Sequence, residues 1–317
     1  MTDPIPPGAI TPLHHTPPEL SYPGLSPQLL ARTKQLWSAR GLDFDPAWRG
    51  GIRALPGFRA VPRVENVTDS AAVDLVFLYD HALLWVRALH AATAAAHSQG
   101  IEGMSLTQWH CLAGVTARLT EQMTALRLLS LTGLPMPAMQ IARSLSEDVD
   151  TALVLLIRPK LSQRFADCRT AEDANEFWRR HIAGGRAFKA ISEKLYSVGI
   201  DHSADTDYAK WRKSVLTILS TAVHSNLVNP MTRTNDRDSP LVNDDSLYFA
   251  TFRIHEFCAY AQLVTPDLAD LLDCAGVTAP GTFAPLAAPL SAILISQIPS
   301  LTAPSHDPKR KGRVRAI

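Results

Sequence analysis

The sequence lacks the features of several common protein classes. It has four cysteines, which are widely separated: Cys111, Cys168, Cys258 and Cys274. Without a closely spaced pair, neither a disulfide framework nor a cysteine-based zinc site is expected. The N-terminus has no basic start followed by an apolar run, so no signal peptide is expected. The longest uncharged stretches, residues 128–142 and 275–306, are interrupted by Gly or Pro. We therefore predict no membrane span and a cytoplasmic location.

An excess of one charge and the common nucleotide motifs are absent as well. The chain of 317 residues has 31 Lys and Arg against 30 Asp and Glu, so the overall charge predicts no polyanionic partner. It has no P-loop, no dinucleotide glycine fingerprint and no Gly-x-Ser-x-Gly elbow. Classical nucleotide-dependent and hydrolase chemistry therefore has no support, and no cofactor is expected.

The two ends of the chain differ from its centre in composition. Residues 1–27 contain eight prolines, which cannot donate hydrogen bonds to a helix or sheet, so residues 1–25 are expected to form an extended arm. Residues 276–317 are rich in Pro and Ala, with one short helix predicted at 290–298. The C-terminal tail holds five basic residues: Lys309, Arg310, Lys311, Arg313 and Arg315. Such a tail attracts nucleic acid without sequence preference or simply keeps a protein soluble.

The central residues 26–275 show helical periodicity and almost no strand-like alternation. Capping residues, glycines and prolines place the helix ends, and residues 42–68 are predicted to be irregular. The expected helices are 27–40, 71–97, 106–131, 139–157, 171–199 with a kink at Gly184-Gly185, 206–226, 245–264 and 266–276. The sequence thus predicts an all-α protein with a single multi-helix bundle.

A charged stripe runs along the helix predicted at residues 139–157. Arg143, Glu147 and Asp150 share this stripe, while the second half of the helix is apolar on every side. An all-apolar helix is buried, and buried charges are costly unless they are paired. The stripe is either a structural clamp, with Arg143 paired to Glu147 at i, i+4, or the wall of a site in which Arg143 binds a phosphate.

A second stripe lies near the end of the helix predicted at residues 206–226. It places His224 beside Ser220 and Thr221, with Asn226 close by. A neutral imidazole there is suited to act as general base towards a ribose 2′-hydroxyl, or as general acid to a leaving oxygen. The alternative is a histidine that is stabilised by the negative end of the helix dipole.

Three segments of the chain form a recognisable series: Ile141-Ala-Arg-Ser-Leu-Ser-Glu147, Gln163-Arg-Phe-Ala-Asp167 and Leu219-Ser-Thr-Ala-Val-His-Ser-Asn226. In this order they resemble the motifs of a bacterial family of unknown function related to the HEPN superfamily. The resemblance covers about residues 75–260. It implies a HEPN-like helical bundle, often homodimeric, and metal-independent ribonuclease chemistry that uses an Arg and a His. The superfamily places that Arg a few residues before the His, whereas residues 217–219 here are Thr, Ile and Leu.

Two hypotheses of function follow. In the first, the protein binds or cleaves RNA in a stress or phage-defence response. His224 then handles the proton, Arg143 the phosphate charge and Glu147 the orientation of either, with Asp150 in support. In the second, the protein is a non-catalytic scaffold, often a homo-oligomer, that engages a protein partner through its arm, its tail and the bundle surface. A small-molecule sensor that binds between helices is a third possibility.

Two further groups of residues are candidates for a functional site. His97 and His110 are expected to come close if their helices form a hairpin, but two histidines without a carboxylate make a poor zinc site, and no metal is expected. A mixed-charge face comprises Glu172, Glu176, Arg179, Arg180 and Arg186, with Trp178 beside it. A solvated surface explains this face, and an edge that contacts RNA is the alternative.

Overall fold

The computed structural model describes residues 22–51, 70–223 and 245–302, and every regular element in these ranges is a helix. The predicted all-α fold class is therefore confirmed. The helices are α2 (Pro27–Ser38), α3 (Phe44–Gly50), α4 (Ser70–Gln99), α5 (Leu106–Leu131), α6 (Pro135–Ile157), α7 (Pro159–Ala166), α8 (Ala171–His181), α9 (Arg186–Ser197), α10 (Asp207–Ser220), α11 (Asp245–Val264), α12 (Leu268–Thr278), the 3₁₀ helix η4 (Ala284–Leu286) and α13 (Ala287–Thr302).

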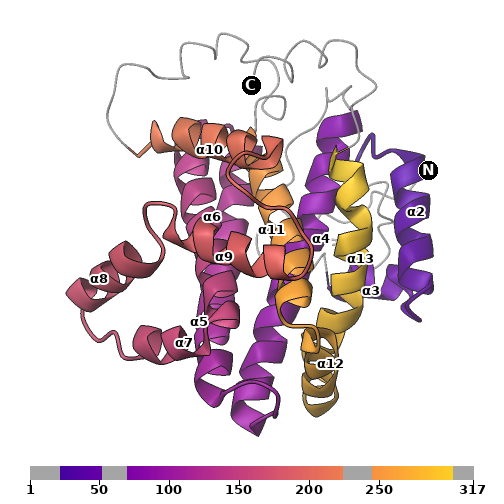
Figure 1. Cartoon of the computed structure of the whole chain (residues 1–317). Coiled ribbons are helices and arrows are strands. Elements are labelled where there is room, and N and C mark those ends of the chain that lie inside the picture. Colours follow the sequence, from indigo (N-terminus) through magenta and orange to yellow (C-terminus); the bar gives the residue numbers. More distant parts are fainter. Residues whose placement is uncertain (1–21, 52–69, 224–244, 303–317) are drawn as a thin grey trace, which may run out of the picture.

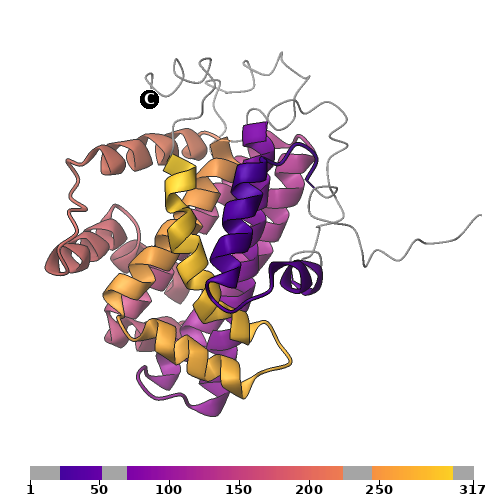
Figure 2. The ribbon, with the colours of Figure 1, turned by 90° about the vertical axis from the view of Figure 1, so that its right-hand side faces the viewer.

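Four long helices, α4, α5, α6 and α11, form the centre of the bundle (Figure 1). α12 and α13 pack against α4, and α2 lies beside α13 on the outside of the bundle (Figure 2). α9 packs on α6, and α10 lies across the end of the same helix (Figure 1). α7 and α8 lie at the edge of the molecule. Helix α6 is therefore central both to the core and to the α9–α10 side.

The local signals in the sequence place several helix ends correctly. α5 begins with a capping box in which the Ser105 side chain accepts from the backbone N–H of Gln108, and the Gln108 side chain accepts in return. Thr170 and Asp173 do the same for α8. Ser26 caps α2, with Pro27 as its first residue. These contacts satisfy backbone N–H groups that have no partner within the helix.

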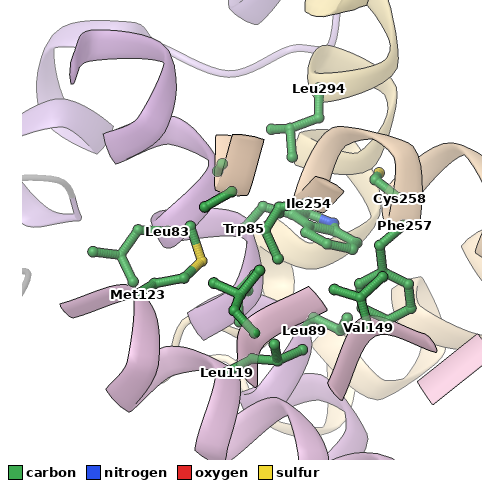
Figure 3. Close-up of a cluster of buried hydrophobic side chains, with 14 of the residues drawn as sticks. Leu83, Trp85, Leu89, Leu119, Met123, Val149, Ile254, Phe257, Cys258 and Leu294 are labelled. Atoms are coloured by element: carbon green, nitrogen blue, oxygen red, sulfur yellow. The ribbon is translucent and has the colours of Figure 1, made fainter. Parts of the chain in front are cut away.

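The core joins side chains from α4, α5, α6, α11 and α13 (Figure 3). Trp85 of α4 packs edge-on against Phe257 of α11, and its indole N–H donates to the hydroxyl of Ser291 in α13 over 2.9 Å. Leu290 and Leu294 of α13 are completely buried in the same cluster. The core therefore continues past residue 275, and α13 is almost twice as long as the short helix predicted at 290–298.

The apolar segment Ala284–Leu301 has the length and composition of a membrane span, although its prolines had suggested otherwise. In this structure 44% of it is buried inside the protein, where it packs against α4 and α11. Hydrophobicity all round a helix is explained equally well by a core position.

Three other helix predictions were wrong in detail. Residues 44–50, predicted to be irregular, form α3, which Asp43 caps. Residues 159–166 form α7, and Pro159 stands at its start, where the missing N–H costs nothing. α6 was predicted to begin at Met139 but begins at Pro135, because proline is tolerated in the first turn of a helix.

The ends of α9 and α10 also differ from the prediction. The predicted kink at Gly184-Gly185 is a complete break, because both glycines have positive φ values of 62° and 77° that a helix does not tolerate. α10 ends at Ser220, and residues 221–223 form a turn before the described part of the chain stops.

A buried ion pair fixes the N-terminal segment to the bundle. Arg127 of α5 donates to both oxygens of Asp80 in α4, over 2.6 and 3.0 Å. The Tyr22 hydroxyl donates to the same carboxylate over 2.6 Å. Because all three groups are removed from water, each depends on the others for its hydrogen bonds.

Candidate functional site

The first part of the candidate site is the contact between Arg143 of α6 and the last turns of α10. One terminal nitrogen of Arg143 donates to the Leu216 carbonyl over 3.1 Å and to the Ser220 hydroxyl. The other lies 3.1 Å from Glu147, which confirms the predicted i, i+4 pair. About a third of each charged side chain remains exposed. The Arg143–Glu147 pair therefore holds the end of α10 while still reaching the surface.

A neighbouring contact from α6 also holds the end of α10. The Gln140 amide donates to the carbonyl of Ala222 over 2.7 Å, just after α10 ends. The last carbonyls of a helix have no partners within it, so side chains from α6 satisfy groups that would otherwise need water. The stripe of α6 thus works as a C-terminal cap for α10.

The structure places only part of the site predicted around His224. Ser220 contacts Arg143 and also donates to Leu216, whereas the Thr221 hydroxyl donates to the backbone of its own turn over 2.7 Å. His224 and Asn226 lie outside the described residues, as does the basic tail at 309–315. Arg143, Glu147 and Ser220 are therefore brought together, and the approach of Arg143 to His224 stays a prediction.

Asp150 pairs with residues other than Arg143 and Glu147, and its supporting role towards His224 stays a prediction. Its carboxylate accepts from Arg253 of α11 over 2.7 Å and from Arg212 of α10. The stripe divides because α6 passes from the edge of the bundle into its interior: at Glu147 it faces α10 and solvent, and one turn later it faces α11 as well.

Asp150 is one of five residues that form a buried ionic cluster, which also includes His202, Arg212, Arg253 and Glu256. None of the five is exposed by more than 9%. Arg253 pairs with Glu256 as well as with Asp150. The His202 Nε2 lies 3.6 Å from Glu256 Oε1, and its Nδ1 lies 2.9 Å from the hydroxyl of Ser192.

The electrostatics of this cluster follow from its two arginines. Burial alone raises the pKa of Glu256, but the charge of Arg253 and the nearby polar groups of His202 and Tyr208 bring it down to about 2. Burial raises the pKa of the Tyr208 hydroxyl, and the charge of Glu256 adds to the effect. Glu256 therefore stays ionised at neutral pH, and the cluster sets the carboxyl groups of Asp150 and Glu256 against the guanidinium groups of Arg212 and Arg253.

Aromatic rings cover the cluster. The Arg212 guanidinium lies 5.1 Å from the centre of the Phe188 ring, and the His202 ring packs against Phe188, Tyr208 and Tyr260. The cluster therefore joins α6, α10 and α11 in the interior of the bundle.

The sequence held a signal for this cluster that our prediction missed. Arg253 precedes Glu256 by three residues on a helix that is otherwise largely apolar. The reasoning applied to α6, that charges on an all-apolar helix must be paired, points to these two residues as well.

A second polar group lies between α5 and α6. Asp148 is 2.8 Å from Arg118 and accepts from the Gln122 amide over 2.8 Å. Gln122 also donates to the Ser144 hydroxyl. Burial is the main cause that raises the pKa of Asp148 to about 6, and Arg118 and Gln122 offset it in part. Asp148 is therefore a carboxyl group that changes charge near neutral pH.

The predicted approach of His97 to His110 is confirmed, since their ring centres are 5.1 Å apart.

His81, on the same helix as His97, lies in the core, where burial lowers its pKa to about 4. Within the three ranges that the structure describes, no three His, Cys, Asp or Glu side chains gather as metal ligands would. A depression between α2 and α3 is lined by Lys34, Ser38 and Phe44 among others. The helices α2 and α3 themselves stand apart from α6 and α10 (Figure 1).

Comparison of the chain with protein-family models, curated proteins and solved structures gives no match.

Proposed function

We propose that this chain is a cytoplasmic, HEPN-like helical protein that binds RNA and cleaves it without a metal ion, in a stress or phage-defence response. The observation that carries the proposal is the contact of Arg143 with Leu216 and Ser220 in the last turns of α10. His224 follows Ser220 by four residues in the sequence. The guanidinium of α6 is thus held next to the segment that leads to the imidazole.

In the proposed reaction the 2′-oxygen of a ribose attacks the adjacent phosphorus, and the bond from phosphorus to the 5′-oxygen breaks. His224 accepts the proton of the 2′-hydroxyl or supplies the proton that the leaving 5′-oxygen needs, and water takes or gives the other proton. Arg143 contacts the phosphate oxygens, for which its planar fork is suited, in exchange for its contact with Ser220. Glu147 keeps the guanidinium oriented through the 3.1 Å pair.

The second candidate function is a non-catalytic scaffold. It is favoured by the saturation of Arg143, because both terminal nitrogens already have partners and the side chain serves as a clamp between α6 and α10. In this function the proline-rich arm, the basic tail and the bundle surface engage a protein partner or a second copy of the chain.

The two functions differ in what the His224→Ala variant does. If the chain cleaves RNA, this variant of the full-length protein should lose cleavage in the presence of EDTA while its circular dichroism spectrum is unchanged. His110→Ala is the matched control, since His110 is an exposed histidine on another helix. Undiminished cleavage by His224→Ala contradicts the proposed role. Absence of cleavage by the unaltered protein favours the scaffold.

A further inference from the structure

The arginines of α7, α8 and α9 form a basic surface. Residues 158–197 contain nine Lys and Arg but only five Asp and Glu, whereas the two charges are balanced over the whole chain. Four of the arginines surround His181, namely Arg158, Arg164, Arg180 and Arg186, and all four are exposed. We call these four residues with His181 the α7–α9 basic surface. It lies at the edge of the molecule, beside the central bundle (Figure 1).

The fold assembles this surface from three short helices. Phe165 of α7 packs on Phe177 of α8, with ring centres 5.1 Å apart, and Phe177 packs on His181 at 5.0 Å. The break at Gly184-Gly185 then turns the chain back. Arg186 donates to the Arg179 and Ala183 carbonyls near the end of α8, over 2.9 and 3.0 Å. His181 is thereby placed close to Arg158 and Arg164 as well as to its sequence neighbours Arg180 and Arg186.

Carboxylates neutralise only part of this charge. Arg180 pairs with Glu176 at 2.5 Å and Arg158 with Glu193 at 3.8 Å, both as exposed pairs that contribute little. Among the described residues Arg164 and Arg186 have no carboxylate partner. Partial burial lowers the pKa of His181, and the charges of the four arginines lower it further. Positive charge therefore exceeds negative charge at this surface.

An exposed aromatic ring adjoins the positive charge. Trp178 is 39% exposed, one turn before His181 on α8, although large aromatic side chains are mostly buried. A flat ring next to arginines is the combination that binds single-stranded nucleic acid, because every base can stack while phosphates contact the cations. An RNA duplex offers no unstacked base, so the ring would add nothing to its binding.

We propose that the α7–α9 basic surface binds single-stranded RNA, with Arg164 and Arg180 on its phosphates and Trp178 stacked on a base. This inference rests on the proposed function for the identity of the ligand, but not on any chemistry at Arg143 or His224. In this inference α7–α9 hold the RNA strand, at a place separate from the contact between α6 and α10.

The test uses the full chain and a fluorescent oligouridine of about 20 nucleotides, which exceeds the ~4–16 nucleotides that single-strand sites cover. Affinity is measured by anisotropy over a series of salt concentrations. The double variant Arg164→Gln, Arg180→Gln should flatten the slope of log affinity against log salt by about 1.4, since each lost phosphate contact removes about 0.7. Trp178→Ala should weaken binding roughly 5- to 150-fold, the loss expected for one stacked base.

A matched control removes the same charge elsewhere. Arg40 at the end of α2 and Lys213 of α10 are exposed, so Arg40→Gln, Lys213→Gln should leave the salt slope unchanged. The inference is overturned if the unaltered protein does not bind oligouridine, if the control flattens the slope equally, or if Trp178→Ala binds normally. Equal affinity for an RNA duplex also overturns the single-strand assignment.

Failure of this inference and failure of the proposed function are distinguishable. His224→Ala should keep its affinity for oligouridine and lose cleavage, whereas the Arg164→Gln, Arg180→Gln variant should lose affinity and still cleave at saturating RNA. If the protein binds RNA through α7–α9 but never cleaves it, only the proposed cleavage chemistry is contradicted. If the protein cleaves RNA but its affinity does not depend on these arginines, only the role of the α7–α9 basic surface is contradicted.

Discussion

The guanidinium of Arg253 on α11 lies 2.7 Å from the carboxylate of Asp150 on α6, in the interior of the bundle. Arg212 of α10 reaches the same carboxylate, so one buried aspartate holds three helices together. A buried ion pair contributes little compared with apolar residues of the same shape, but the removal of one partner leaves an unpaired charge out of water. Asp150 is therefore a position at which the fold is sensitive to a single substitution.

Asp150→Ala should lower the free energy of unfolding by roughly 3–5 kcal/mol, because two buried arginines lose their shared partner. Urea denaturation followed by circular dichroism measures this change. The matched control is Glu147→Ala, one turn earlier on α6, where the lost pair is partly exposed and the expected cost is about 1 kcal/mol or less. Equal losses in the two variants contradict a special role for the buried cluster.

Asp148 should make stability depend on pH. Its pKa rises from 3.8 in the unfolded chain to about 6 in the fold, mainly through burial, so the folded protein holds this proton more tightly. The resulting stability is fully present below about pH 4 and is lost as the pH rises through 6, by roughly 3 kcal/mol at most.

The Asp148→Asn variant has no carboxyl group to titrate at this position. Its free energy of unfolding should therefore fall less between pH 4 and pH 7 than that of the unaltered protein. Chemical denaturation at both pH values measures the difference, in which the contributions of all other titrating groups cancel. Asp207→Asn, at a fully exposed carboxylate, is the control and should follow the unaltered protein. An unchanged pH dependence in Asp148→Asn would show that Asp148 titrates normally.

The pKa of His181 should respond to the arginines around it. It is lowered by partial burial and by the charges of Arg164, Arg158, Arg180 and Arg186. The Arg164→Gln, Arg180→Gln variant should therefore raise this pKa part of the way towards its ordinary value, with the effect of burial remaining. NMR titration of the imidazole C–H signals measures it. The result is contradicted if the pKa stays where it was, or if it moves equally in the Arg40→Gln, Lys213→Gln control.

A chain that ends at residue 275 should fail to fold stably. It would lack α13, whose Leu290 and Leu294 are fully buried and whose Ser291 accepts the hydrogen bond from Trp85. The loss of several buried aliphatic side chains at about 2–5 kcal/mol each exceeds the marginal stability of most domains. Thermal unfolding followed by circular dichroism tests this, with a chain ending at Thr302 as the control. A cooperative transition in the shorter chain would place the end of the domain at 275.

Much of the helical pattern was determined by the sequence, because caps and periodicity act between residues a few positions apart. Ser105 and Thr170 choose where α5 and α8 begin through contacts with residues three positions later. Gly184 and Gly185 separate α8 from α9 because only glycine adopts their backbone angles at no cost. The pair of Arg143 with Glu147 follows from helical spacing alone.

The assignment of partners was decided only by the tertiary structure. Arg143, Glu147 and Asp150 share one stripe in the sequence, yet Arg143 caps α10 at the edge of the bundle, whereas Asp150 pairs with arginines from α10 and α11. Periodicity gives the face of a helix on which a residue lies, but not the neighbour that covers that face. The arginines around His181 are likewise brought together by the packing of α7, α8 and α9. Contacts between distant segments depend on how whole helices pack, which no local pattern encodes.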